Sequence, residues 1–263
     1  MPAVCTRPSA THLVLIPSYN PGPKVYDTVR EARACWNPVW VVDDGSTDGS
    51  TAGLIEMATQ VDGLRVLVIH QNQGKGAAVL LGLEEAARGG FTHALCMDAD
   101  GPHSAALIPE FMERSQREPA AMVLGVPVFD DSAAPLRAWG RKVSNWWANL
   151  ESLWMGIGDS LYGFRVYPIA PLRQVMHGQA WMRRFDFNTE AVVRLCWINV
   201  RPLNLPVTVK FVSADEGGIS HVGSWRDNRL HFWTHVRLML GLVVRLPGLL
   251  LLRLVSLISL MSR

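Results

Sequence analysis

The chain has little net charge and few cysteines. Its formal net charge is +2 over 263 residues, which is not the strongly basic balance of a nucleic-acid-binding protein, so we expect no nucleic acid among its partners. The four cysteines are widely separated and lack the paired spacing of a zinc site, which indicates reduced thiols in a cytosolic setting. We also expect no signal peptide, because the apolar run near the amino end, residues 13–16, has only the length of a strand.

Acidic residues are absent from Asn228 to Arg263, although arginine recurs there. The apolar runs between the arginines fall short of the ~18 residues of a simple membrane-spanning helix. Each arginine would cost about 2.5–3.5 kcal/mol at the centre of such a helix, whereas a leucine gains only about 0.3–0.6 kcal/mol. We therefore expect a globular domain over residues 1–230, followed over 231–263 by two short amphipathic helices, hinged near Pro247 and lying in the membrane interface. The alternative is a pair of core or dimer-interface helices.

Tryptophans recur at helical spacing in the middle of the chain. Trp139, Trp146, Trp147 and Trp154 share a helix face and lie among basic residues. Indoles favour the headgroup boundary of a membrane, and cations can meet lipid phosphate there. The segment is therefore a second candidate for membrane contact, with a buried aromatic core as the alternative.

Short apolar runs alternate with helical patterns along the first half of the chain. The composition is 49% hydrophobic, which is enough for a full core. The expected strands are centred near Leu13, Val39, Leu64–Ile69, Ala94, Met122–Val128 and Val207–Val212, and the expected helices cover Val25–Cys35, Ala52–Gln60, Ala77–Arg88 and Ala105–Gln116. This order predicts an α/β fold with a mostly parallel, Rossmann-like central sheet flanked by helices, whose ligands bind beyond the carboxyl ends of the strands.

Two carboxylates, Asp98 and Asp100, follow one of these apolar runs. Residues i and i+2 of an extended segment point to the same face, so the two side chains can converge while Ala99 turns away. Carboxylate oxygens suit Mg²⁺ or Mn²⁺, and such an ion can bind a diphosphate. The pair therefore predicts a metal site, with a solvated turn as the alternative.

Two further runs end in polar loops that can share the same crevice. The run at residues 39–42 ends in Asp43 and Asp44, where like charges repel unless one of them meets a donor. The run at 13–16 ends in a loop that includes Pro17, Tyr19 and Asn20. The polar loops after these three expected strands therefore predict a single ligand site.

Four segments of the chain, residues 15–20, 41–48, 72–78 and 97–103, resemble in order and spacing the family 2 glycosyltransferases of the GT-A fold. Residues 159–167 and 185–190 further resemble the branch that includes the polyprenyl-phosphate mannosyl- and glucosyltransferases. The resemblance implies an enzyme that uses a nucleotide-diphosphate sugar and a divalent metal ion.

The resemblance also implies roles for individual residues on the donor side. Asp44 would accept a hydrogen bond from the base, Asp98 would face the ribose or the metal ion, and Asp100 would bind the metal ion. His103 or the late histidine His221 would complete the metal shell, because Pro102 stands where relatives often have a glutamine ligand. The other donor-side candidates are Pro17, Tyr19, Asn20, Lys75 and Gly76.

On the acceptor side, Arg141 and Ser144 match a polar pair of that branch. Arg165 and Arg226 are further candidates for the acceptor phosphate, although Arg226 can instead pair with a neighbouring aspartate. Many relatives that act on hydroxyls carry an aspartate base after Thr-Glu, but here Ala191 follows Glu190. A phosphate acceptor is already anionic and needs no base, so the sequence favours a lipid phosphate.

The sequence therefore predicts an inverting glycosyltransferase that moves a sugar from UDP or GDP to a membrane lipid, most simply a polyprenyl phosphate, at the cytoplasmic face of the membrane. In one alternative the acceptor is a hydroxyl on a lipid or a polyketide-like molecule, with Asp186 or Glu190 as the base; Glu190 can equally be a structural partner of a buried arginine. In another, the chain is a nucleotide-sugar binding module without turnover.

Overall fold

A computed structural model describes residues 8–99, 105–129, 135–179, 181–209 and 225–261 of the chain. Its sheet has seven strands in the order β3-β2-β1-β4-β6-β5-β7. The strands are β1 His12–Ser18, β2 Val39–Asp44, β3 Leu64–Ile69, β4 His93–Cys96, β5 Met122–Phe129, β6 Arg165–Pro168 and β7 Pro202–Val209. The helices are α1 Lys24–Cys35, α2 Ser50–Gln60, α3 Lys75–Arg88, α4 Ile108–Arg117, α5 Pro135–Glu151, α6 Ile169–His177, α7 Phe187–Trp197 and α8 Trp225–Met261, with a short 3₁₀ helix, η1, at Ala105–Leu107.

The sheet is mostly parallel, as the alternation of runs predicts. Strands β1, β2, β3 and β4 pair in parallel, and so do β5 and β7. Strand β6 lies between β4 and β5 and is antiparallel to both. The other six strands therefore all have their carboxyl ends at the same edge, where β1 ends at Ser18 and β2 at Asp44.

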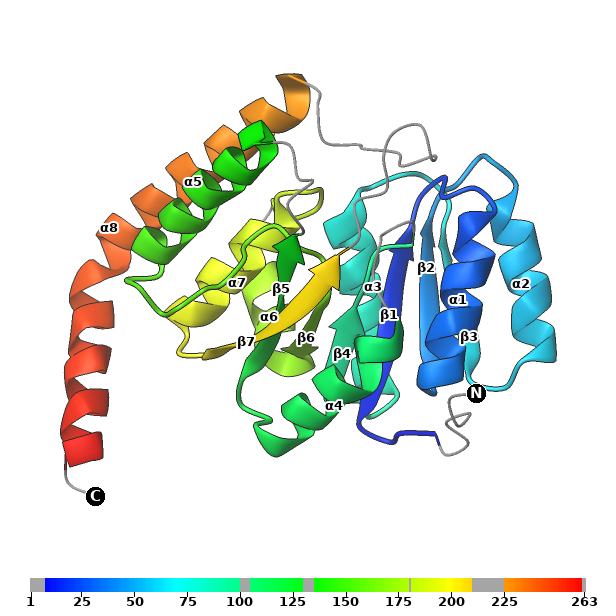
Figure 1. The fold of residues 1–263 in the computed structure, drawn as a ribbon, viewed down its shortest axis with the longest axis horizontal. Coiled ribbons are helices and arrows are strands. Elements are labelled where there is room, and N and C mark those ends of the chain that lie inside the picture. The colour runs from blue at the N-terminus through cyan, green and yellow to red at the C-terminus, as the bar shows by residue number, and fades with distance from the viewer. Residues whose placement is uncertain (1–7, 100–104, 130–134, 180, 210–224, 262–263) are drawn as a thin grey trace.

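Helices cover both faces of the sheet (Figure 1). Successive side chains of a strand point to opposite faces, and β1 divides accordingly: Leu13 and Leu15 pack with residues of α3, α6 and α7, whereas Val14 and Ile16 pack with residues of α1, α2 and α4. The two apolar clusters hold the sheet rigidly, so the loops at its carboxyl edge start from fixed positions.

The last strand begins earlier than the sequence pattern indicates. We expected a strand over Val207–Val212, but β7 covers Pro202–Val209 and pairs with β5 from Met122 to Phe129. Prolines at 202 and 206 disfavour a strand locally because they lack an N–H donor. Strand β7 is at the edge of the sheet, where a strand needs its donors on one side only, so both prolines are tolerated.

The carboxyl end of the described chain forms one helix rather than the two that we expected. Helix α8 runs from Trp225 to Met261 with Pro247 inside it. A proline costs a helix about 3 kcal/mol because one backbone hydrogen bond is lost. The leucine-rich turns on both sides of Pro247 have high helix propensity and offset that cost. The expected boundary at residue 231 therefore falls within a continuous helix.

The first half of α8 packs against the protein, and the second half extends past α5 (Figure 1). Leu238 and Leu242 are buried, whereas Val243, Val244 and Leu251 are exposed. The stretch Arg229–Leu251 is long and apolar enough to cross a membrane by length and composition. An apolar helix surface thus extends beyond the packed core.

Polar side chains also join α8 to α5. The Nδ1 atom of His235 lies 2.8 Å from Oε1 of Glu151, and Nε2 of His231 lies 2.9 Å from Oγ of Ser144. Burial raises the pKa of Glu151 to about 9 and lowers the pKa of both histidines to about 4. At neutral pH these groups are uncharged, so they join the helices as a hydrogen-bonded network.

Three of the tryptophans predicted to share a face are in contact. The ring centroid of Trp146 lies 5.2 Å from that of Trp147 and 6.4 Å from that of Trp154, with the rings edge to face. Trp146 and Trp154 are exposed, and so is Trp139. The indoles therefore form an exposed aromatic surface next to α8.

Two histidines stack at the amino ends of β1 and β4, and they predict acid sensitivity. The rings of His12 and His93 are buried with their centroids 4.4 Å apart. Burial lowers the pKa of His12 to about 4 and also lowers the pKa of His93. Between about pH 4 and about pH 6.5 the unfolded chain binds more protons than the folded one, so the free energy of unfolding falls as the pH falls through this range. We expect the melting temperature to drop from neutral pH to about pH 5, and to drop less in His12→Gln. An equal drop in both proteins would contradict this assignment.

Candidate active site

The loops after β1 and β2 are joined by Asn20. Its backbone N–H donates to Oγ of Ser46 at 2.9 Å, and its Oδ1 accepts from the backbone N–H of Thr47 at 2.7 Å. Asn20 has a φ of +47°, a left-handed conformation that asparagine tolerates better than most residues. Tyr19 is half exposed next to it. The predicted donor-side residues of these two loops thus lie together.

Asp44 organises the loop before α3. Its two carboxylate oxygens accept from the backbone N–H groups of Gln73, at 2.9 Å, and Gly74, at 2.7 Å. Burial raises the pKa of Asp44, and these two donors offset part of that rise. The carboxylate that we expected to bind the base of the nucleotide therefore already accepts hydrogen bonds from two backbone N–H groups.

Two polar atoms beside Asp44 have no hydrogen-bond partner among the described residues. They are Oγ of Ser18 and Oδ1 of Asp43, both buried. Ser18 and Asp43 are neighbours in the register of β1 and β2, at the carboxyl edge of the sheet. Buried polar atoms without partners are costly, so this pair is a candidate to contact the nucleotide. Asp43 has no predicted role from the sequence, because a pair of adjacent acids does not reveal which of them the loop engages.

Lys75 and Asp98 meet between the start of α3 and the end of β4. Nζ of Lys75 forms an ion pair with Oδ1 of Asp98. Both side chains are largely buried, with 11% and 31% of their surface exposed. The sequence predicted both residues on the donor side, and the structure brings them together.

The loop Gly74–Gly76 packs directly against the segment 182–184. A Cβ at Gly76 would overlap the carbonyl oxygen of Met182, and one at Gly74 would lie 2.7 Å from Cγ of Arg184. The N–H of Ala77 donates to the carbonyl oxygen of Arg183 at 3.1 Å. Glycine at these positions therefore allows two backbone segments to touch, which places Lys75.

A third loop, Asp159–Phe164, packs against Asp98. Oδ1 of Asp159 accepts from the backbone N–H groups of Leu161, at 2.9 Å, and Tyr162, at 2.6 Å. Gly163 then lies so close to the Asp98 carboxylate that a Cβ would overlap Oδ2 and lie 3.0 Å from Cγ. Gly163 is a site residue that we did not single out from the sequence, where it stands two residues before the segment that forms β6.

This contact gives a testable prediction. In Gly163→Ala the new methyl group must displace the Asp98 carboxylate, so we expect a roughly tenfold loss of kcat/KM, since small misplacements of reacting groups are costly. Gly140→Ala is the matched control, because a Cβ there meets nothing within 4 Å. Steady-state kinetics of both variants test the contact, and equal activities would contradict it.

The acceptor-side candidates divide between buried and accessible positions. Arg165 is fully buried, and its guanidinium donates to the carbonyl oxygens of Asn188, at 2.6 Å, and Asp159, at 3.1 Å. Ser144 is buried beneath α8. These placements argue against the phosphate contacts expected of Arg165 and Ser144. Arg141 pairs with Asp159 at 2.7 Å and keeps 27% of its side chain exposed, so it remains a candidate.

Both candidate bases are paired with arginines. Glu190 is fully buried; its Oε2 accepts from Arg194 at 2.8 Å and its Oε1 from Nη2 of Arg237 at 2.7 Å. Oδ2 of Asp186 lies 3.1 Å from the same Nη2 atom. The sequence left open whether Glu190 is a base or a structural partner of an arginine, and this geometry favours the structural role.

Several predicted ligands lie outside the described residues. Asp100, His103 and His221 are not described, and neither is the side chain of Arg226. Within the described ranges no three His, Cys, Asp or Glu side chains form a metal-binding group. Of the proposed metal ligands the structure describes Asp98, whose oxygen donors suit Mg²⁺ or Mn²⁺ and whose side chain is partly exposed near the carboxyl end of β4.

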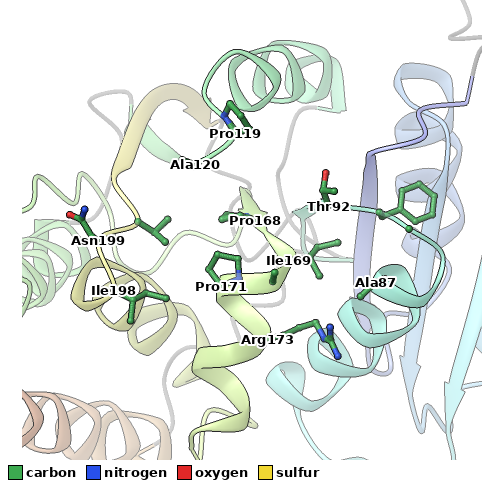
Figure 2. Close-up of a pocket in the computed structure, with 14 residues that line it drawn as sticks. Ala87, Thr92, Pro119, Ala120, Pro168, Ile169, Pro171, Arg173, Ile198 and Asn199 are labelled. Carbon is green, nitrogen blue, oxygen red and sulfur yellow. The ribbon is translucent and has the colours of Figure 1, made fainter.

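A pocket of about 540 Å³ lies away from these residues (Figure 2). It is lined by Phe91 and Thr92 before β4, by Pro119 and Ala120 before β5, and by residues 198–200 before β7. These are the amino ends of parallel strands. The pocket is therefore at the edge of the sheet opposite Asp44 and Asp98, and it is separate from the candidate active site.

The sheet is mostly parallel, and acidic loops follow the carboxyl ends of its strands, among them the segment with Asp98 after β4. This is the architecture of the GT-A glycosyltransferases. The chain belongs to glycosyltransferase family 2: residues 13–188 match the family model described as Glycosyl transferase family 2. It is accordingly a glycosyltransferase.

Two relatives are mannosyl-transferring enzymes by name. The chain is 34% identical over 209 residues to the polyprenol monophosphomannose synthase of Mycolicibacterium smegmatis, and the matched region covers 77% of this chain and 78% of that protein. It is 25% identical over 210 residues to the undecaprenyl-phosphate mannosyltransferase of Micrococcus luteus, covering 78% and 85%. These relatives match the branch that the sequence resembles.

Solved structures agree on the fold. Glucosyl-3-phosphoglycerate synthase from Mycobacterium tuberculosis in complex with UDP superposes with a TM-score of 0.61 at 16% identity, covering 88% of this chain and 80% of that one. The same enzyme with Mn²⁺ and UDP-glucose gives 0.57 at 16% identity, covering 80% and 74%.

Proposed function

We propose that the protein transfers a hexose from a UDP- or GDP-sugar to the phosphate of a polyprenyl lipid, with inversion at the anomeric carbon, at the cytoplasmic surface of a membrane. The observation on which this rests is the pairing of Glu190 and Asp186 with arginines. A hydroxyl acceptor needs a base to remove its proton, whereas a lipid phosphate is already an anion. Because both carboxylates are paired with arginines, the site suits a lipid phosphate acceptor, which needs no base.

The donor would bind at the carboxyl edge of the sheet. Asn20 and Tyr19 would border the nucleoside, with Ser18 and Asp43 beneath them, and Asp44 would hold the loop that presents Lys75. Asp98 and Asp100 would hold Mg²⁺ or Mn²⁺, with His221 as a further ligand. A bound dication would neutralise the charge that develops on the departing diphosphate. One of the solved structures with this fold, glucosyl-3-phosphoglycerate synthase, contains Mn²⁺ and UDP-glucose.

The acceptor would approach from the side of α5 and α8. Arg141 on α5 keeps 27% of its side chain exposed, and Arg226 belongs to the first turn of α8, which follows the undescribed segment 210–224. The exposed indoles and the apolar second half of α8 would lie in the headgroup region. The names of both relatives specify a polyprenol or undecaprenyl phosphate.

The proposal is tested by offering matched acceptors. We would incubate the full chain with vesicles containing either a polyprenyl phosphate or the corresponding polyprenol, together with a panel of UDP- and GDP-hexoses and Mn²⁺. Mass spectrometry of the extracted lipids should find a glycosylated product from the phosphate alone. Product formed from the polyprenol would favour the alternative of a hydroxyl acceptor.

A further inference from the structure

We propose that Arg237 of α8 is a positioning residue for the donor-binding loop Gly74–Gly76. The inference deepens the proposed function and rests on it for the identity of the ligand. Arg237 touches neither Lys75 nor Asp98 by any contact that the structure records. It acts instead through the amino end of α7 and the segment that precedes that helix.

Arg237 joins two carboxylates at the amino end of α7. Its Nη2 atom lies 2.7 Å from Oε1 of Glu190 and 3.1 Å from Oδ2 of Asp186, and its Nε donates to the same Glu190 oxygen at 3.0 Å. Its guanidinium also lies over the ring of Trp181, with Cζ 5.4 Å from the centroid. Asp186 and Glu190 are one helical turn apart, so their like charges would repel without the arginine between them.

Asp186 extends this contact to the segment that touches the loop. Its Oδ1 accepts from the backbone N–H of Arg184 at 3.1 Å. The carbonyl oxygen of Arg183, one residue earlier, accepts from the N–H of Ala77 at 3.1 Å. The same segment fills the space above Gly74 and Gly76. A continuous series of contacts thus leads from Arg237 to the first turn of α3.

The end of that series is the Lys75–Asp98 pair. The loop has little freedom of its own, because Gly74 also donates to Asp44 and Gly76 is in backbone contact with Met182. Loosening the amino end of α7 would release one side of this loop. Lys75 would then lose its fixed position at Asp98, and the protein would bind the diphosphate of the donor less tightly. Because Arg237 is on α8, the helix with the exposed apolar surface is mechanically connected to the donor side.

Amide hydrogen exchange tests the connection without any ligand. In Arg237→Gln, the amides of residues 74–78 should exchange roughly tenfold faster than in the wild type, since local opening controls exchange. Asp186→Asn, which breaks the series at its next member, should act on the same amides. Arg237→Lys keeps the charge but not the two-oxygen contact, so it should give an intermediate rate. Arg245→Gln is the matched control, because Arg245 is on the same helix and stacks on Trp197 of α7 at 5.0 Å without reaching either carboxylate.

Nucleotide affinity gives the second readout. With Mn²⁺ and UDP-glucose or GDP-mannose as probes, calorimetry should find roughly tenfold weaker binding in Arg237→Gln and unchanged binding in Arg245→Gln. Unchanged exchange at 74–78 in both Arg237→Gln and Asp186→Asn would overturn the inference, as would an equal effect of Arg245→Gln. A wild-type protein that binds none of the probes would contradict the proposed function, while the exchange rates still decide whether Arg237 orders the loop.

Discussion

Asp98→Asn should reduce glycosyl transfer by at least about 100-fold, the usual cost of removing one electrostatic group that stabilises a transition state. The asparagine has almost the same volume, so the loops around it can keep their positions. It is neutral, however, and can neither balance Lys75 nor help to hold a dication. The measurement is the rate of nucleoside diphosphate release at saturating donor and acceptor.

The control for this variant is Asp27→Asn. Asp27 is an exposed residue of α1 that pairs with Arg30 at 2.8 Å, so it reports on a lost surface carboxylate alone. Its activity and melting temperature should match those of the wild type. If Asp98→Asn retained most of the activity while remaining folded, the active site would have to lie elsewhere.

Glu190→Gln should lower the free energy of unfolding by about 3 kcal/mol, the range expected when one partner of a buried ion pair is removed. The glutamine leaves Arg194, with only 7% of its side chain exposed, and Arg237 without their carboxylate. At saturating donor, the fraction that remains folded should still transfer sugar to a lipid phosphate at close to the wild-type kcat, because that acceptor needs no base. Denaturant unfolding and kinetics on the same samples give both values.

The two interpretations of Glu190 predict opposite results. A structural residue loses stability and keeps turnover, whereas a catalytic base keeps stability and loses turnover. Glu113→Gln is the control, since Glu113 is an exposed residue of α4 that pairs with Arg117. Wild-type stability together with a loss of turnover in Glu190→Gln would make Glu190 the base and would favour a hydroxyl acceptor.

The strand and helix order of the first half could be predicted from the sequence because it depends on local patterns. The apolar runs near Leu13, Val39, Leu64 and Ala94 are bounded by polar loops, and each became a strand within a residue or two. The same logic placed Asp44, Lys75 and Asp98 at one edge, because parallel strands that end together bring their loops together.

Contacts between distant segments account for what the sequence could not predict. Strand β7 takes its length from its pairing with β5, and α8 continues through Pro247 because the turns around it favour a helix. The burial of Arg165 depends on acceptors contributed by Asp159 and Asn188. Gly163 and Arg237 gained their importance only once the fold had brought them to Asp98 and to α7.

The most direct test of the central claim is calorimetry of nucleotide-sugar binding with and without Mn²⁺. The claim is that Asp98 and Asp100 hold a dication against the diphosphate of the donor. Mn²⁺ should therefore strengthen the binding of at least one UDP- or GDP-hexose to the wild type, and Asp100→Ala should abolish that gain. Affinities that are the same with and without Mn²⁺ or Mg²⁺ for every donor in the panel would contradict the account.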